Sequence, residues 1–161
     1  MKEYHPDSIR NIALIGHGGS GKTSFSEAAC FCAGSTTRLG RVEEGNTISD
    51  YHPDEVERQI SINSAVISNE WHGYKINLID TPGYTDFTGE VKASLRVADT
   101  ALIFLKAVEG AEVGTEIVWE YTRELRIPSL FVVSKLDNEN ADFDNVVGQA
   151  RERFSHDVIP V

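Results

Sequence analysis

A glycine-rich stretch near the amino terminus constrains this chain more than any other feature. Residues 16–23 read GHGGSGKT and directly follow the apolar run Ile12 to Ile15. The stretch fits the pattern Gly-x-x-x-x-Gly-Lys-[Ser/Thr], in which glycines let the backbone form a concavity lined with N–H groups. A helix that starts at the lysine adds its positive dipole end, and both features favour a bound phosphate. The sequence therefore predicts a strand, a phosphate-binding loop (the P-loop, residues 16–24) and a helix, in that order.

Each part of the P-loop has an expected task. Lys22 should bring a positive charge to the β- and γ-phosphates, and the hydroxyl of Thr23 should bind Mg²⁺. The alternative is a glycine-rich turn that binds nothing, and the Lys-Thr pair at this offset disfavours it. The P-loop residues expected at the nucleotide are Gly16, His17, Gly18, Gly19, Ser20, Gly21, Lys22, Thr23 and Ser24.

Strand patterns and helix patterns alternate along the chain. Strands are expected at residues 9–15, 60–67, 74–79, 101–108 and 129–134, and helices at residues 22–33, 87–97, 113–125 and 142–154. The turn His72-Gly73 should join the second and third strands as an antiparallel hairpin. Strands that are joined through helices should run parallel. The predicted fold class is α/β: a three-layer P-loop domain with a mostly parallel sheet and one antiparallel strand.

The composition limits the classes of function. A length of 161 residues with 40% hydrophobic residues suits one domain that spans residues 1–161. Lys and Arg number 15 against 25 Asp and Glu, and the formal charge of -10 opposes a broad electrostatic grip on nucleic acid or anionic lipid. No stretch approaches the roughly 18 apolar residues of a membrane span. We expect a cytoplasmic monomer without direct nucleic-acid binding, and we interpret the acidic run Asp54 to Glu57 as a solvated loop face.

A second motif addresses the choice of base. Ser134-Lys135-Leu136-Asp137 follows an apolar strand and is similar to the guanine motif Asn-Lys-x-Asp. The carboxylate of Asp137 can accept hydrogen bonds from N1–H and the 2-amino group of guanine, whereas adenine presents neither donor. Lys135 would lie along the base with its alkyl stem. The motif predicts guanine nucleotides, with Ser134, Lys135 and Asp137 at the nucleotide.

A third motif, Asp80-Thr81-Pro82-Gly83, ends the strand 74–79. Together, GHGGSGKT, ERQISI, DTPGYTDF and SKLD resemble the GTP-binding domain of bacterial elongation factor G and its elongation factor G-like relatives, over essentially the whole chain. The resemblance implies that Asp80 orients a water on Mg²⁺ and that the N–H of Gly83 meets the γ-phosphate. It also implies that residues 35–61 form the first switch and residues 84–90 the second, with an order that depends on the γ-phosphate and Mg²⁺.

Departures from the family pattern fall at functional positions. Residues 58–61 read Arg-Gln-Ile-Ser where most of the family has Arg-Gly-Ile-Thr, so Ser61 should supply the hydroxyl for Mg²⁺. Ser134 replaces the Asn of the guanine motif, and Tyr84 replaces the His that orients the attacking water. The expected catalytic residues are Lys22, Gly83 and Tyr84, and the expected metal ligands are Thr23, Ser61 and Asp80.

We expect the chain to be the GTP-binding part of a longer factor, ending before the final strand and helix of the domain. The Ser-Ala pair that completes the guanine pocket in the family does not occur after SKLD, and the later domains that contact the ribosome are also missing. A ribosome partner is therefore expected for the full-length protein. Two functions remain open: a ribosome-stimulated GTPase of the elongation or ribosome-protection type, and a GTP-dependent switch with little hydrolysis. An ATP-using enzyme such as a small kinase is disfavoured by Asp137.

Overall fold

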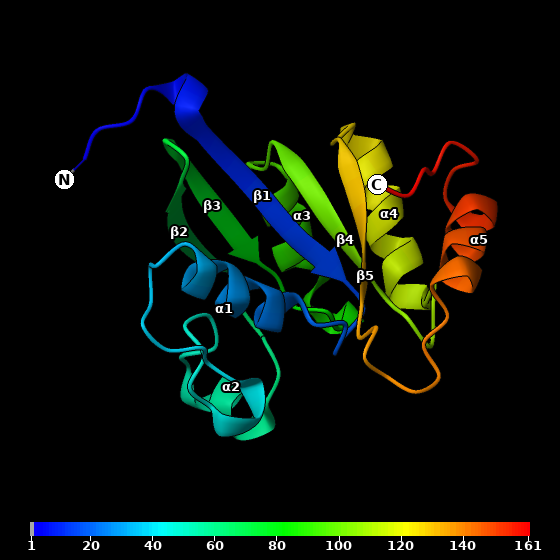
Figure 1. Ribbon diagram of the computed structural model, residues 1–161, viewed down its shortest axis with the longest axis horizontal. Coiled ribbons are helices and arrows are strands. Elements are labelled where there is room, and N and C mark those ends of the chain that lie inside the picture. Colours follow the sequence, from blue (N-terminus) through cyan, green and yellow to red (C-terminus); the bar gives the residue numbers. More distant parts are fainter. Residues whose placement is uncertain (1) are drawn as a thin grey trace.

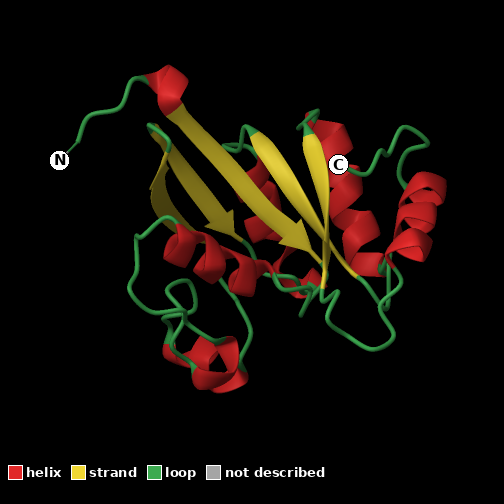
Figure 2. Ribbon diagram, viewed as in Figure 1, coloured by secondary structure: helices red, strands yellow, loops and turns green. Residues whose placement is uncertain are grey.

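Residues 2–161 of the computed structural model form a five-stranded sheet in the order β2-β3-β1-β4-β5, with helices on both faces (Figures 1 and 2). The strands are β1 (Ile9–Gly16), β2 (Ala65–Trp71), β3 (Tyr74–Asp80), β4 (Thr100–Lys106) and β5 (Ser129–Ser134). The α-helices are α1 (Lys22–Cys32), α2 (Pro53–Arg58), α3 (Thr88–Leu95), α4 (Val113–Leu125) and α5 (Phe143–Arg153). β1, β3, β4 and β5 are parallel, and β2 pairs antiparallel with β3. The predicted three-layer α/β fold is confirmed.

Alternate side chains of β4 face different helical layers. Ala101 and Ile103 are fully buried in the cluster that includes residues of α3 and α4. Phe104 faces the other way and meets Phe25 of α1, with the ring centroids 5.4 Å apart. Because both faces of the strand are covered at residues 103–105, these three successive apolar residues of β4 are buried.

The register brings four chain segments to one edge of the sheet. Leu14 of β1 pairs with Asp80 of β3, and Gly16 pairs with Phe104 of β4. The carboxyl ends of the parallel strands therefore lie together, which is where ligands bind in open α/β sheets. The P-loop, the second switch, the loop 107–112 and the turn 135–138 all start from this edge (Figure 1).

The second strand begins later than the sequence predicted. β2 starts at Ala65, and residues 60–64 belong to the preceding loop. The N–H groups of Ile62 and Asn63 donate to the carboxylate of Glu55, and that of Ser64 donates to Glu90. These side-chain acceptors replace the strand partner that the apolar pattern implied, so the first half of the predicted strand 60–67 is wrong. The predicted hairpin with β3 is confirmed.

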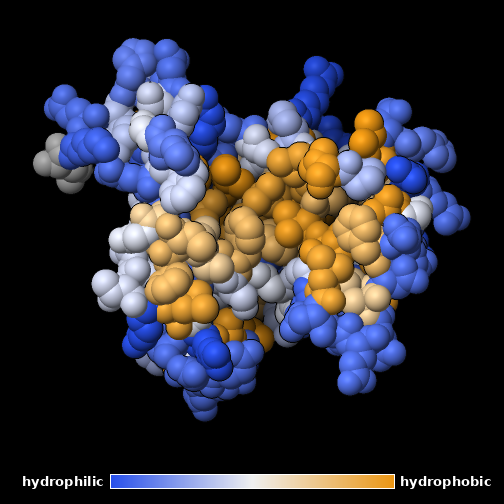
Figure 3. All heavy atoms as spheres, in the orientation of Figure 1, coloured by the Kyte–Doolittle hydropathy of each residue, from blue (hydrophilic) through white to orange (hydrophobic). Residues whose placement is uncertain are grey.

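The face of the sheet that carries α1 is only partly covered. α1 lies over the β1, β2 and β3 side. On β4 and β5, Leu102 and Val132 are half-buried, and Leu130 is 57% exposed. Figure 3 shows apolar side chains gathered over the middle of this face. Within residues 2–161, no helix has the length and apolar character needed to cross a membrane.

Candidate functional site

The P-loop joins the end of β1 to the start of α1 through a backbone that only glycine adopts easily. Gly16, Gly19 and Gly21 have φ angles of 143°, 68° and 88°. A Cβ on Gly16 would lie 2.8 Å from the carbonyl oxygen of Phe104, so β1 and β4 approach this closely because the side chain is absent. Gly21 is the N-cap of α1 and brings no side chain to its first N–H groups. Those N–H groups are left for a ligand.

Lys22 folds back into the P-loop. Its Nζ donates to the carbonyl oxygens of Gly16, at 3.2 Å, and His17, at 3.0 Å. Burial lowers the pKa of Lys22 to about 8, against the opposing effect of the carboxylates of Asp80, Asp50 and Glu112. A phosphate in the loop would favour the charged ammonium, so the position of Lys22 suits an anionic ligand.

Two carboxylates and two hydroxyls lie close together beside the P-loop. Thr23 Oγ1 lies 3.3 Å from Ser61 Oγ, and the Ser61 hydroxyl lies 2.7 Å from Asp50 Oδ1, to which it donates. Asp80 is 1% exposed, and neither of its carboxylate oxygens has a hydrogen-bond partner among the described residues. Burial raises the pKa of Asp80 to about 6, although the nearby Thr23 hydroxyl and Lys22 ammonium lower it.

This oxygen-rich set fits Mg²⁺. Magnesium prefers hard oxygen ligands, and a buried carboxylate without a partner is costly unless a cation or donor meets it. The sequence predicted Thr23, Ser61 and Asp80 as ligands, and the structure places the two hydroxyls together with Asp80 close by. Asp50, which is 5% exposed, was not predicted at the site.

Two buried carboxylates hold the first switch, Glu27 from α1 and Glu55 from within the switch itself. Glu27 of α1 accepts from the N–H groups of Gly40, at 3.1 Å, and Ile48. Glu55 of α2 accepts from three backbone N–H groups, those of His52, Ile62 and Asn63, at 3.2, 3.0 and 2.9 Å. The interpretation of residues 54–57 as a solvated loop face is therefore wrong for Glu55, which is 1% exposed.

Glu55 holds the two residues that follow Ser61, and Glu27 holds the earlier part of the switch; sequence reasoning missed both. For Glu27 a signal existed, because it falls on the buried stripe of α1 between Thr23 and Cys30. For Glu55 we find no such signal, since its neighbours Asp54 and Val56 are both exposed.

The second switch starts in contact with the P-loop. A Cβ on Gly83 would lie 2.6 Å from Lys22 Nζ and 2.7 Å from the backbone nitrogen of Gly18. The ring of Tyr84 lies across Gly18, where an added Cβ would be 3.0 Å from Tyr84 Cζ. Gly18 therefore provides the space that the tyrosine ring occupies.

A cavity of about 260 Å³ lies between the P-loop and the two switches. It is lined by the predicted residues Gly18 to Ser24, Ser61, Gly83, Tyr84 and Lys135, and by the unpredicted residues Val42, Glu43, Asp50, Gln59 and Ile60. A larger cavity, of about 610 Å³, lies between β5, α4, α5 and residues 155–161. Its lining is mainly apolar and includes none of the predicted site residues. We therefore assign the chemistry to the smaller cavity.

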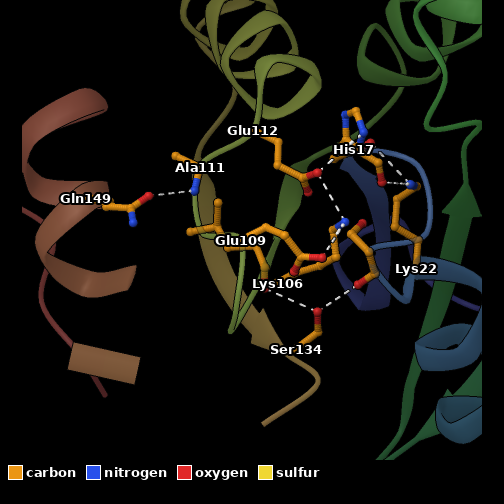
Figure 4. Close-up of polar contacts among 11 residues, drawn as sticks. His17, Lys22, Lys106, Glu109, Ala111, Glu112, Ser134 and Gln149 are labelled. Atoms are coloured by element: carbon orange, nitrogen blue, oxygen red, sulfur yellow. Dashed lines mark hydrogen bonds and ion pairs between the residues drawn. The ribbon is translucent and has the colours of Figure 1, made fainter. Parts of the chain in front are cut away.

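The three predicted base-binding residues do not all line the cavity. The hydroxyl of Ser134 donates to the carbonyl oxygens of Ser20, at 2.8 Å, and Leu105, at 3.2 Å (Figure 4). Ser134 thus ties the P-loop to β4 and β5. Lys135 has a φ of 57° and lines the cavity, whereas Asp137 is exposed on the turn that follows and does not line it.

Comparisons with known proteins agree with this geometry. A family model described as the elongation factor Tu GTP binding domain matches residues 7–160. A mitochondrial ribosome-releasing factor 2 of Debaryomyces hansenii is 45% identical over 159 residues, which are 99% of this chain and 18% of that protein. Elongation factor G 2 of Borreliella burgdorferi is 44% identical over 147 residues, or 91% of this chain and 22% of that protein. The chain thus spans about a fifth of the length of these curated relatives.

A solved structure is similar over most of the chain. A crystal structure of a protein from Thermus thermophilus superposes with a TM-score of 0.87 at 39% identity. The match covers 90% of this chain and 22% of that chain. The fold therefore recurs in a larger protein.

Proposed function

The chain belongs to the family of the elongation factor Tu GTP-binding domain, and we propose that it binds GTP and GDP with Mg²⁺ and hydrolyses GTP. We also propose that residues 1–161 are the GTP-binding domain of a longer translation factor that acts on the ribosome. The observation that carries the proposal is the buried pair of Lys22 and Asp80 beside a glycine-lined cavity. The relatives named elongation factor G 2 and ribosome-releasing factor 2 support the part that concerns translation.

Nucleotide binding rests on the P-loop backbone and Lys22. The free N–H groups at the start of α1 would surround the phosphates, and Lys22 would exchange a carbonyl contact for a phosphate oxygen. Ser134 keeps the loop in register with β5, the strand that leads to Lys135 and Asp137. The carboxylate of Asp137 would then select guanine by accepting from N1–H and the 2-amino group.

Thr23, Ser61 and Asp80 would hold the Mg²⁺, with Asp50 supporting Ser61. When bound, the ion neutralises charge that develops on the phosphates during transfer. Asp50 accepts from the Ser61 hydroxyl at 2.7 Å, so the lone pairs of that hydroxyl remain available to a metal.

Hydrolysis would depend on Lys22, Gly83 and Tyr84. Lys22 and the Gly83 N–H would meet charge on the γ-phosphate, and Tyr84 would orient the attacking water. The phenol hydroxyl can donate to and accept from a water, but it lacks the positive charge that a protonated histidine supplies. We expect unstimulated turnover on the order of 10⁻⁴ s⁻¹, as in an isolated small GTPase.

A nucleotide titration tests the proposal. GDP and GTP should bind in preference to ATP by about 2 kcal/mol or more, and Asp137→Ala should remove most of that preference. Lys22→Ala should weaken the binding of GDP, GTP and ATP alike. Phosphate release by the full-length protein, measured with and without ribosomes, then tests the translational part, because added ribosomes should accelerate it. Equal affinity of the unmodified chain for ATP and GTP would contradict the proposal.

A further inference from the structure

A series of contacts between polar side chains connects the P-loop to the start of α4 (Figure 4). Lys106, the last residue of β4, lies 3.1 Å from a carboxylate oxygen of Glu112 and 3.3 Å from one of Glu109. The same oxygen of Glu112 lies 3.5 Å from Nε2 of His17. Glu112 is therefore the member that touches both the lysine and the P-loop.

His17 contacts the P-loop through its backbone and α4 through its ring. Its carbonyl oxygen accepts from Lys22 Nζ at 3.0 Å and from the N–H of Ser20 at 3.3 Å. Its ring lies against Gly114 in the first turn of α4, where an added Cβ would be 2.5 Å from Nδ1. Because ring and carbonyl belong to one residue, contacts that hold the ring also restrict the movement of the carbonyl that accepts from Lys22.

The charged side chains in this series of contacts are partly buried. The side chains of Lys106 and Glu112 are 12% and 20% exposed, whereas that of Glu109 is 49% exposed. Burial opposes the charge of Lys106, yet the carboxylates of Glu112 and Glu109 raise its pKa overall. Lys106 also balances the negative charge of Glu112, which would otherwise face an incoming phosphate.

Glu112 does not serve as a helix cap through its side chain. It is the N-cap residue of α4, and among the described residues its carboxylate makes no capping hydrogen bond. Removing the carboxylate would thus cost α4 no cap of this kind, and it would free the ring of His17 on one side.

We propose that Glu112, held in place by Lys106, is a positioning residue that fixes the P-loop through His17 and slows the release of the bound nucleotide. This inference rests on the proposed nucleotide binding. The proposed role belongs to the contact between Glu112 and His17, and Glu109 has no share in it.

Release of a fluorescent GDP analogue from the full chain tests this role. Glu112→Ala should raise the dissociation rate constant about five-fold, which corresponds to about 1 kcal/mol, the upper end for a contact of this kind at a protein surface. Lys106→Met should raise it as well, because Glu112 then loses its support. Glu109→Ala is the matched control, since it removes the other carboxylate on Lys106 and should leave the rate within about two-fold.

A double-mutant cycle separates positioning from loss of stability. The effect of Glu112→Ala should largely vanish in a His17→Ala background, while Tm without nucleotide should fall by similar amounts in both backgrounds. If Glu112→Ala and Glu109→Ala release GDP equally fast, or if Glu112→Ala acts fully without His17, the positioning role is wrong. Failure of the unmodified chain to bind GDP would instead overturn the proposed function, and this inference with it.

Discussion

The P-loop and the first switch contribute one hydroxyl each to the same site, but they are held by different means. Thr23 belongs to a loop that is fixed by backbone: positive-φ glycines, strand pairing and the close approach of Gly16 to Phe104. Ser61 belongs to a segment that contains few regular elements and is held by the carboxylates of Glu27 and Glu55. One half of the site therefore depends on the absence of side chains, and the other depends on two charged ones.

This difference predicts different failures. A loop that is fixed by its backbone is destabilised when a Cβ is added, whatever the polarity of the new side chain. The loss of stability extends to the strands that meet at the loop. A segment that is held by a carboxylate is destabilised when the charge of that carboxylate is lost. This loss of stability is confined to the segment. The following predictions test whether the two halves fail in these distinct ways.

The largest effect should follow Gly16→Ala. The new Cβ would lie 2.8 Å from a backbone oxygen, at a φ of 143°. We expect a loss of about 3 kcal/mol or more in the free energy of unfolding, measured by urea titration. The control is Gly19→Ala, with a φ of 68° and no described atom within 4 Å of the added Cβ, which should cost about 1 kcal/mol. Equal losses would show that strain alone, without the close approach, decides the outcome.

Glu27→Ala should have the next largest effect, and a local one. It leaves the N–H groups of Gly40 and Ile48 without their acceptor, at a cost of about 2 kcal/mol. Proteolysis within residues 38–61 should become at least about ten-fold faster, while cleavage in the sheet changes little. Glu57→Ala, at an exposed position on α2, should leave the cleavage rate unchanged. A uniform increase in cleavage over the whole chain would argue against a local clamp.

Local patterns predicted the backbone-held half well. α4 and β5 have the predicted bounds, 113–125 and 129–134, because apolar periodicity and turn residues are local signals. The P-loop was also predictable, since its glycines stand at fixed spacing before a helix. Thr23 was predicted as a Mg²⁺ ligand from the P-loop motif and Ser61 from the family resemblance, and the structure brings their hydroxyls to 3.3 Å.

The carboxylate-held half was not predictable in the same way. The strand expected at residue 60 starts at Ala65, because Glu55 takes the N–H groups that a neighbouring strand would otherwise pair. A charged residue in a polar stretch is expected to be exposed to solvent. Only the tertiary fold buries Glu55 and Asp50. The same holds for Glu112, whose two partners are distant in sequence or lie in the preceding strand.

Glu55→Gln should produce a smaller effect that depends on pH. Burial alone would raise the pKa of Glu55, but three backbone N–H groups outweigh it and lower the pKa below the ordinary 4.5. The ionised carboxylate therefore adds stability that is present above pH 4.5 and is lost as the pH falls through the folded-state pKa. We expect the variant to lose about 1 kcal/mol of hydrogen-exchange protection in residues 52–63 at pH 7.

The deficit of Glu55→Gln should shrink as the pH falls below 4.5, because wild-type Glu55 then becomes neutral as well. Asp54→Asn is the matched control on the exposed side of α2. Its hydrogen-exchange protection should equal that of wild type at pH 7 and at pH 3. A deficit that stays constant from pH 7 to pH 3 would mean that the shape of the side chain, and not its charge, holds the segment.

The smallest effect should come from Ser134, a side-chain tie within the backbone-held half. Its hydroxyl donates to the carbonyl oxygens of Ser20 and Leu105, and a neutral hydrogen bond contributes about 0.5–1 kcal/mol. Ser134→Ala should therefore weaken GDP binding about three-fold, whereas Ser134→Asn keeps a donor with a longer reach and should tighten it. Ser129→Ala, which removes a hydroxyl that donates to Ile127 at the other end of β5, should leave GDP affinity unchanged. If Ser134→Ala instead abolishes binding, the P-loop depends on this one hydroxyl as the first switch depends on its carboxylates, and the contrast between the two halves fails.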